Sequence, residues 1–557
     1  MFSFQFSLKQ LEHYRQWKFD SFESLDCFIA QHLQAKLKRR VFFVDSYFKG
    51  MNKGGGTYLV CTPSVQDGIF IKQINTSLQL RLINKEVTPF HFGAVGDGVN
   101  DDTNAIKKAI VSKSSQLNLH LGTDLSSRFL ISDSLLFKNA DFVSIRGHGT
   151  IIRKGSSIDG KRAFYALIKI ENCKDIVLEG NWSIDGNRDK QSYKNIKKIG
   201  IGKYFLRHNG DIFISCYSKK PDEQNIYIKI NEIKNSFLNG IVLWNTNNTT
   251  VLSTKFKNTT WNGISGAGLT SLSIHNCRFT MCGGSKNLST NLIQGDRAGV
   301  QVRELPKYFS FKSEGMTVDG NGKEQGKINL NIKISMNSFI SCGVQSIYLR
   351  AGFDCHIEKN YSVNCGYLRL HKENRYRPAH IWLESGEYNV RSNLIVQRRH
   401  NPSTGWMMPD GIRITTLNGD ATKYFPATGI CKSFLSGNSI CSLDKMNRAL
   451  FYNGLRTNGN CTVTNLLVKG TLHTAVWLIN SASFEGETVV RDFQLLNSAF
   501  YAIAQESRFP KAIVYVSRFG KVSGHPENIE ISRISKASNL NDIKFNNNLR
   551  LNGSYGI

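Results

Sequence analysis

The sequence predicts an all-β protein whose main part is a parallel β-helix, a solenoid of stacked coils that a short α-helix caps and a small helical and β module precedes. Two observations predict this fold. Glycine corners recur at intervals of 20 to 23 residues, and short strands of alternating apolar residues follow them. Coils of this length bury their apolar residues only by stacking on one another. The corner glycines are Gly240, Gly263 and Gly283, and again Gly343 and Gly366.

The first 87 residues divide into two parts of different character. Residues 1–40 are polar, with apolar residues such as Leu25, Phe28 and Ile29, and predict an N-terminal helical segment. In residues 41–87, two apolar strands flank a glycine turn at 54–56, which predicts a small β module.

Residues 88–110 are the most specific stretch of the chain. An apolar strand containing Phe90 and Phe92 leads into a turn at 96–98, and the side chains of residues 101–103 can accept hydrogen bonds from the free N–H groups of a helix start. A short helix with one apolar stripe after a strand predicts a cap over an open apolar core, so the aspartates here are not catalytic candidates. The stripe comprises Ala105, Ile106, Ala109 and Ile110.

This segment resembles the opening segment of the pectate-lyase-like right-handed β-helices, a family that includes bacteriophage tailspikes and other polysaccharide-degrading enzymes. The pair of strands around the glycine turn in residues 41–87 is similar to the small module that precedes the β-helix in many tailspikes. The resemblance implies right-handed coils over residues 88–520 and a homotrimer. Residues 521–557 are short and rich in asparagine, which predicts only a short C-terminal segment. The resemblance also implies a phage or prophage tailspike depolymerase that acts on a capsular or exopolysaccharide and attaches to the tail or baseplate through its N-terminal segment. The high positive charge and the lack of an obvious C-terminal trimerisation module depart from the family.

The charge of the chain narrows the classes of partner. Its 71 basic and 43 acidic residues give a net charge of +28, which suits nucleic acid, an anionic membrane or an acidic polysaccharide. The basic runs lack any nucleic-acid-binding motif, which favours the polysaccharide.

Location and cofactors follow from what the sequence lacks. No window approaches 18 apolar residues and the start does not have the layout of a signal peptide. We therefore expect a protein made in the cytoplasm that acts in a virion tail fibre or spike, or outside the cell, without inserting into a membrane. The 12 cysteines do not have metal-ligand spacing, and no aspartate cluster resembles a calcium site, so neither a metal nor a cofactor is expected.

The repeats also predict what lies inside and outside each coil. Asparagine, phenylalanine and cysteine recur beside the glycine corners and should form internal ladders. In the strands that follow, alternation places Val302, Leu349 and Leu383 inside, so the residues between them should face solvent. One outward column then holds Gln301, Tyr348, Trp382, Arg413, Phe451 and Trp477, and the next holds Arg303, Arg350, Glu384 and Thr415, with His380 sharing the orientation of Trp382 and Glu384.

These outward residues predict a sugar-binding groove at about 296–416. Sugar rings stack on aromatic faces, and arginine binds an acidic sugar through two hydrogen bonds. Longer insertions interrupt the repeat here and map to loops on one side of a solenoid. The alternative is that the aromatic residues pack against another subunit, and for Phe451 and Trp477 this alternative is the stronger. The predicted substrate-binding set is Gln301, Arg303, Tyr348, Arg350, His380, Trp382 and Arg413.

Glycoside hydrolysis needs two carboxyl groups, about 5 Å apart for retention and about 6.5–9.5 Å apart for inversion. Glu384 is the first, and the second is Glu304, Asp410 or Asp296. Trp382 beside Glu384 favours a general acid and Arg350 favours a permanently charged carboxylate, so both roles stay open.

Two other functions also fit the sequence. A polysaccharide lyase would use Tyr348 or His380 as the base and arginines 303, 350 and 413 to neutralise a uronate. A non-catalytic, glycan-binding structural β-helix is the third possibility.

Overall fold

The computed structural model describes most of the chain between residues 17 and 516. The segments outside the description are 1–16, 33–39, 64–68, 85, 114, 156–165, 192–209, 217–223, 284–297, 304–308, 313–314, 319–327, 367–377, 399–407, 416–430, 444–449, 459, 465, 470, 481–487, 491–493, 497–500, 508–513 and 517–557.

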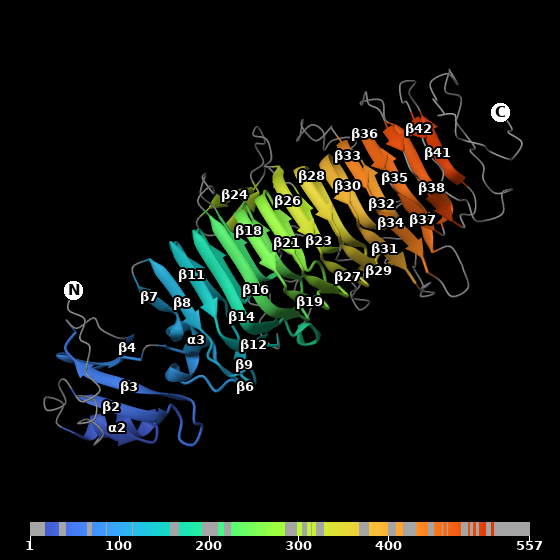
Figure 1. The fold of residues 1–557 in the computed structure, drawn as a ribbon. Coiled ribbons are helices and arrows are strands. Elements are labelled where there is room, and N and C mark those ends of the chain that lie inside the picture. The colour runs from blue at the N-terminus through green and yellow to red at the C-terminus, as the bar shows by residue number, and fades with distance from the viewer. Residues whose placement is uncertain are drawn as a thin grey trace, which may run out of the picture.

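The N-terminal module is a five-stranded sheet with one helix packed on it (Figure 1). Helix α2 starts at Ser21, whose hydroxyl accepts from the backbone N–H of Ser24 at 3.2 Å. Its buried Leu25 shares one hydrophobic cluster with Phe42 of the sheet, so the helix expected in residues 1–40 packs against the expected β module. The elements are β1 (Lys18–Phe19), α2 (Phe22–Gln31), β2 (Val41–Ser46), β3 (Gly54–Cys61), β4 (Ile69–Asn75) and β5 (Leu78–Leu82), in the sheet order β1-β2-β3-β5-β4.

The segment that follows closes the open end of the solenoid, as predicted. The expected strand at Phe90 and Phe92 is wrong, because Pro89 starts a short 3-10 helix there, η2 (Pro89–Phe92). The buried Asp102 carboxylate accepts from the backbone N–H groups of residues 95 and 96 at 2.7 and 3.1 Å and so fixes the turn before the helix. Strand β6 (Asp97–Asp101) and helix α3 (Thr103–Ala109) complete the cap, and Ala105, Ile106 and Ala109 join the main core.

The rest of the described chain is a right-handed parallel β-helix, which appears as one elongated stack of strands in Figure 1. In the described coils, each coil gives one strand to each of three parallel sheets, and strands at the same place in successive coils pair in parallel. Strand β7 (Val111–Lys113) lies antiparallel to β8, β24 (Phe309–Lys312) and β25 (Gly315–Val318) form a separate hairpin, and η3 (Arg188–Lys190) is a short 3-10 turn.

The first sheet carries the predicted groove. It contains β10 (Leu135–Lys138), β13 (Ile168–Glu171), β15 (Gly210–Ser215), β17 (Asn239–Trp244), β20 (Ile264–Ala267), β23 (Ala298–Arg303), the first halves of β28 (Gln345–Glu358) and β30 (Ala379–Arg391), β32 (Asp410–Thr415), β35 (Phe451–Asn458), β38 (Thr471–Asn480) and β41 (Tyr501–Ser507).

The second and third sheets close each coil. The second contains β8 (Gln116–His120), β11 (Phe142–Arg146), the first halves of β14 (Asp175–Asp185) and β16 (Asn225–Lys234), β18 (Asn247–Leu252), β21 (Thr270–His275), β26 (Asn329–Ser335), the second halves of β28 and β30, β33 (Cys431–Ser436), β36 (Asn460–Thr464), β39 (Thr488–Val490) and β42 (Val514–Val516). The third contains β9 (Arg128–Ile131), β12 (His148–Arg153), the second halves of β14 and β16, β19 (Lys255–Lys257), β22 (Arg278–Thr280), β27 (Ser338–Ile340), β29 (Tyr361–Val363), β31 (Leu394–Gln397), β34 (Ser439–Ser442), β37 (Leu467–Lys469) and β40 (Gln494–Leu496).

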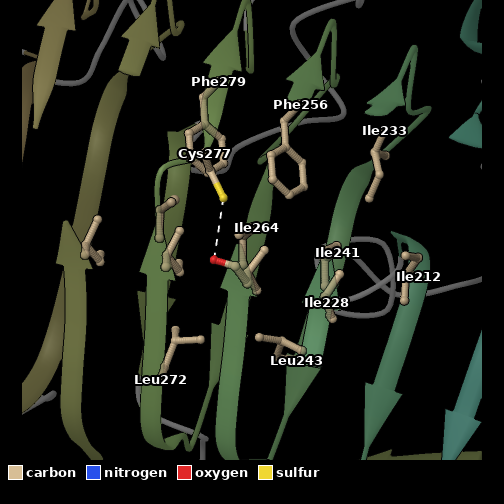
Figure 2. Close-up of a cluster of buried hydrophobic side chains, with 14 of the residues drawn as sticks. Ile212, Ile228, Ile233, Ile241, Leu243, Phe256, Ile264, Leu272, Cys277 and Phe279 are labelled. Atoms are coloured by element: carbon tan, nitrogen blue, oxygen red, sulfur yellow. Dashed lines mark hydrogen bonds between the residues drawn. The ribbon is translucent and has the colours of Figure 1, made fainter. Parts of the chain in front are cut away.

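The predicted internal ladders are confirmed. The rings of Phe256 and Phe279, side by side in Figure 2, stack with centroids 4.7 Å apart, and Phe339 continues the stack at 4.8 Å. Cysteines 282, 342 and 365 are buried in successive coils. In the asparagine ladder, each side-chain amide donates to the carbonyl oxygen of the next at 3.0–3.1 Å, through Asn337, Asn360, Asn393 and Asn438.

The corners between the second and third sheets hold residues in the left-handed region. Met336 has a φ of 57°, and Asn276 one coil earlier has a φ of 52°. This conformation costs an ordinary side chain about 1–2 kcal/mol, while asparagine tolerates it. The Met336 side chain is exposed and contributes little packing to offset that strain.

We therefore expect Met336→Asn to raise the free energy of unfolding by up to about 1 kcal/mol in a urea titration. The matched control is Leu330→Asn, which replaces an exposed apolar residue in strand β26 without a positive φ and should give no gain. Equal effects of the two substitutions would contradict the corner-strain explanation.

Candidate functional site

The coil register brings the predicted outward columns together on the first sheet. Gln301 pairs with Tyr348, Tyr348 with Trp382, and Trp382 with Arg413. The second column pairs Arg350 with Glu384 and Glu384 with Thr415.

Phe451 does not belong to the first column, contrary to expectation. It is fully buried in the main core, and the residue that pairs with Arg413 is Arg456, which in turn pairs with Trp477. The alternation in residues 450–457 fits two registers, and the structure selects the one in which Leu455 pairs with Ile412.

The two columns differ in exposure. The side chains of Arg350 and Glu384 are 21% and 16% exposed. Tyr348 and Trp382, which were expected to face solvent, are only 3% and 7% exposed, and Gln301 and Arg413 are also buried. The aromatic rings point away from the main core and belong to a separate cluster with Ala298 and Ala379.

The centre of the site is a tyrosine, a carboxylate and a guanidinium from adjacent coils. The Tyr348 hydroxyl donates to Glu384 Oε2 at 2.5 Å, and Arg350 Nε lies 3.7 Å from the same oxygen. The guanidinium of Arg303 lies 5.1 Å from the centroid of the Tyr348 ring.

The protonation states at this centre follow from burial and charge. Burial, reinforced by the Glu384 charge, raises the pKa of Tyr348 well above its ordinary value. Tyr348 therefore keeps its proton and acts as a donor. The Tyr348 hydroxyl and the Arg350 guanidinium both lie on Oε2 of Glu384 and so orient its carboxyl group, while these contacts leave Oε1 free.

Trp382 links this centre to the next coil. Its ring lies 5.4 Å from that of Tyr348, and the Arg413 guanidinium lies 5.1 Å from its centroid. The indole Nε1 donates to Thr415 Oγ1 at 3.0 Å, so the ring is held between two coils. On the opposite side of Tyr348, the Gln301 amide satisfies its neighbours when its oxygen accepts from Arg303 Nε at 2.5 Å and Nη2 at 2.9 Å and its nitrogen donates to Asn262 Oδ1 at 3.2 Å.

The structure does not place Asp410 where it could serve as the second catalytic carboxylate. Arg413 Nη2 lies 2.5 Å from Asp410 Oδ2, and Asn453 Nδ2 donates to Oδ1 at 2.8 Å. Both partners of the ion pair are buried, so the carboxylate is occupied and closed to substrate. The other two candidates, Glu304 and Asp296, lie outside the described residues.

His380 is also misplaced by strict alternation, because it lies inside the coil. Its Nδ1 is 2.7 Å from Ser362 Oγ and its Nε2 is 3.0 Å from Gln397 Oε1. The corner turns two consecutive residues inward, and the neighbouring coil has Gly411 at this position, where a Cβ would meet the core side chain of Ile440. Burial lowers the pKa of His380 to about 3, so the imidazole is neutral.

Sequence reasoning left out two polar residues of this region, Gln345 and Asn453. Gln345 pairs with Ala298 two residues before the inward Ile347, where alternation predicts an inward side chain. The sequence pattern alone could not identify these residues, because the direction of their side chains depends on how the chain bends at the corner.

Within the described ranges, no group of three or more histidine, cysteine, aspartate or glutamate side chains is arranged to hold a metal ion. No helix in that part of the chain is long and apolar enough to cross a membrane.

Comparison with known proteins gives structural likenesses only. The sequence matches no family model and no curated protein. Among solved structures, pre-mature bacteriophage phi29 gene product 12 is 14% identical with a TM-score of 0.42, and the enzymatically active domain of bacteriophage CBA120 tailspike protein 2 is 12% identical with a TM-score of 0.41. The exopolygalacturonase of Thermotoga maritima is 13% identical with a TM-score of 0.38.

The matched regions differ in extent. They cover 78%, 92% and 78% of this chain and 52%, 58% and 91% of the phi29, CBA120 and Thermotoga chains. The chain therefore spans little more than half of each phage protein. Its own coils establish the fold, which is the right-handed parallel β-helix that the segment at 88–110 predicts.

The burial of His380 predicts a pH-dependent stability. The folded chain holds the pKa of this imidazole at about 3, against 6.5 as its ordinary value. Between these values the unfolded chain binds a proton that the folded chain does not, so stability is fully present above about pH 6.5 and falls as the pH decreases toward 3. Thermal melts at about pH 7.5 and about pH 5 should show a smaller loss of melting temperature for His380→Gln than for the wild type.

The same substitution at the partly exposed His120 is the control and should leave the wild-type pH dependence in place. An unchanged pH dependence in His380→Gln would show that His380 is not its source.

Proposed function

We propose that the site around Glu384 binds and hydrolyses an acidic polysaccharide of a bacterial surface. The observation that carries the proposal is a partly exposed carboxylate held between the Tyr348 hydroxyl and the Arg350 guanidinium. The described first-sheet strands between residues 298 and 415 carry two carboxylates, Glu384 and Asp410. Glu384 is partly exposed, whereas Asp410 is buried.

The charge of the site favours an anionic substrate. Arg303 lies against the Tyr348 ring and Arg350 beside Glu384, so two guanidinium groups and one carboxylate surround Tyr348 and the local charge is positive. Guanidinium groups recognise carboxylates through paired hydrogen bonds, so a uronate or similar acidic sugar fits this surface. The net charge of +28 on the whole chain acts in the same direction over longer distances.

In the hydrolytic mechanism that we propose, Glu384 acts as the base or nucleophile, and the general acid is Glu304 or Asp296. These two residues border strand β23 in the sequence, two coils before Glu384.

The lyase alternative is less well supported. Its two candidate bases are Tyr348, whose raised pKa keeps the hydroxyl protonated, and His380, which is enclosed in the core. The non-catalytic alternative needs no base and differs by its outcome, which is binding without cleavage.

The homotrimer and the attachment to a phage tail through the N-terminal module stay part of the proposal. Both rest on the resemblance of residues 41–87 and 88–110.

We expect Glu384→Gln to lower the rate of polymer cleavage by at least about 100-fold, because the amide cannot act as a base or nucleophile. The measurement is the fall in polymer size over a panel of purified capsular polysaccharides, followed by size-exclusion chromatography. Glu387→Gln is the matched control, since Glu387 is an exposed carboxylate further along the same strand.

A Glu384→Gln variant with full activity would exclude the site, and wild-type binding without any cleavage would favour the non-catalytic alternative. Growth of the ultraviolet absorbance of an unsaturated uronate would identify a lyase.

Tyr348→Phe removes the hydrogen bond to Glu384 and keeps the ring that packs on Trp382. A hydrogen bond to a charged group contributes about 1.5–3 kcal/mol, so kcat should fall roughly 10- to 100-fold with a smaller change in KM. An unchanged kcat would show that the hydroxyl does not prepare Glu384 for the reaction.

A further inference from the structure

Basic side chains gather on the outer face of the third sheet, which is not the sheet of the candidate site. Strand β19 carries Lys255 and Lys257, and strand β22 of the next coil carries Arg278. Their strand neighbours Phe256 and Phe279 belong to the buried ring stack (Figure 2), so the three cations point away from the core. All three are exposed to solvent.

The coil register places like charges beside each other on this face. Lys255 pairs with Arg278, and Lys257 pairs with Lys234 of the preceding coil. Glu232 pairs in register with Lys255, but its carboxylate lies 3.6 Å from Lys234 Nζ. Among the described residues, Lys255, Lys257 and Arg278 form no ion pair. Like charges directly opposite each other on paired strands destabilise a sheet, so the free protein carries unrelieved repulsion here.

Surface pairs on the second sheet combine opposite charges instead. Glu179 pairs with Lys229, and Glu387 pairs with Lys432. The same parallel register therefore neutralises cations on one face of the solenoid and accumulates them on another. Because an anionic ligand relieves the repulsion between the accumulated cations, the third-sheet face suits a polyanion.

The basic positions continue along the solenoid axis into an aromatic residue. Arg278 pairs with Ser338, and Ser338 pairs with Tyr361, so one outward column crosses four successive coils. The Tyr361 side chain is partly exposed, and its hydroxyl accepts from Nη2 of the exposed Arg398 at 3.3 Å. We call the following set the third-sheet column: Lys255, Arg278, Ser338 and Tyr361, with the adjacent Lys257.

We propose that the third-sheet column is a second, non-catalytic binding surface for the acidic polysaccharide. The inference rests on the proposed function, because it assigns a further contact to the same polymer. Neighbouring coils are about 4.8 Å apart, so the column presents cations at short, regular intervals to the repeated negative charges of an extended sugar chain. The Tyr361 ring offers a face on which a sugar ring stacks.

The shape and composition of the column favour a polysaccharide over other polyanions. Its cations and its aromatic ring follow one line along the axis, which matches a single chain better than the plane of an anionic membrane. A polyphosphate supplies charge but no ring to stack on Tyr361. An acidic polysaccharide supplies both.

The column also lies close along the chain to the sheet of the candidate site. Each third-sheet strand leads into a first-sheet strand, as β22 leads into β23, β27 into β28 and β29 into β30. A polymer held on the column raises the local concentration of its other segments at the first sheet. The column should therefore lower the KM for long polymers and leave kcat unchanged.

The binding test uses the full chain with Glu384→Gln, so that cleavage does not consume the probe. The probe is immobilised polygalacturonate, in which every sugar carries a carboxylate. Serine at positions 255, 257 and 278 together should raise its Kd at least about fivefold, because three exposed charge contacts are lost. The difference should shrink in about 1 M sodium chloride, which screens exposed charges.

The matched control removes three exposed lysines of the second sheet, Lys229, Lys333 and Lys432, and so changes the net charge equally. Its Kd for polygalacturonate should stay within about twofold of that of the parent chain. An equal loss in the control and in the triple serine variant would assign the attraction to net charge and overturn the proposal.

Tyr361 separates a polysaccharide surface from a general cationic one. Tyr361→Ala should raise the Kd for polygalacturonate at least about threefold, and Tyr361→Phe, which keeps the ring, should restore it. Binding of inorganic polyphosphate should not depend on Tyr361. Unchanged binding of polygalacturonate by Tyr361→Ala would overturn the proposal. Tighter binding of oligothymidylate than of polygalacturonate would also overturn it, because the column would then be a nucleic-acid surface.

A stability measurement distinguishes a binding role of the cations from a structural one. The triple serine variant loses like-charge repulsion, so its melting temperature should equal or exceed that of the parent chain. A lower melting temperature would show that the three cations serve the fold and would overturn the proposal.

The experiments also separate the column from the proposed function. In the chain with Glu384 intact, the triple serine variant should keep kcat and raise KM on the capsular polysaccharide that the wild type cleaves. Retained cleavage by Glu384→Gln contradicts the proposed function alone. Unchanged binding of polygalacturonate by the triple serine variant contradicts the third-sheet column alone.

Discussion

The parallel pairing of each coil with the next is the constraint on which the rest of this structure depends. Ile347 pairs with Ile381, and Ile381 pairs with Ile412, so the residues that follow them meet outside the core at the spacing of paired strands. That pairing places Tyr348 beside Trp382 and aligns Arg350 with Glu384. The coil stacking that builds the asparagine and phenylalanine ladders inside the core therefore also assembles the site outside it. A shift of one residue in one coil would turn the site residues of that coil inward and break both.

Burial separates the roles of the two carboxylates that the coils bring to this face. Asp410 and Arg413 are both buried, and removing either would leave an unpaired charge in a medium that stabilises it poorly. Their function is to neutralise each other and to hold Arg413 over the Trp382 ring. Glu384 keeps part of its surface exposed, and its partners leave one carboxylate edge for a substrate or a water molecule. Exposure rather than residue type thus distinguishes the carboxylate that a substrate could reach from the one that is enclosed.

Sequence patterns predicted the parts of the fold that depend on period and failed where the chain turns a corner. The Ile-x-Leu and Ile-x-Ile strands at 347–349 and 412–414 have a period of two, so their outward neighbours were placed correctly. His380 was placed outside because alternation assumes a straight strand, whereas the bend before Ile381 turns two consecutive residues inward. Asp410 precedes its strand's alternating residues, and no local pattern could show that Arg413 would pair with it. Exposure of Tyr348 and Trp382 was overestimated for the same reason, since alternation gives the side of the sheet but not what covers it.

The corner row of the first sheet shows that this fold can satisfy a polar side chain when it needs to. Glycine occupies this row at positions 240, 263, 299 and 411, where an added Cβ would lie only 2.5–2.6 Å from the nearest neighbouring atom. Asp211 and His380 occupy it instead in two coils, and each has partners from other strands: Arg153 Nη2 lies 2.8 Å from Asp211 Oδ1, and Ser362 and Gln397 bond to His380. Gln345 lies one position outside the same row and has neither a glycine's freedom nor a partner. Two neighbouring polar groups, Asp211 and Asn453, each keep one partner and leave one buried oxygen unpaired, whereas both polar atoms of the Gln345 amide lack a partner, so the satisfaction of polar groups along these corners is incomplete and depends on what the adjacent coil supplies.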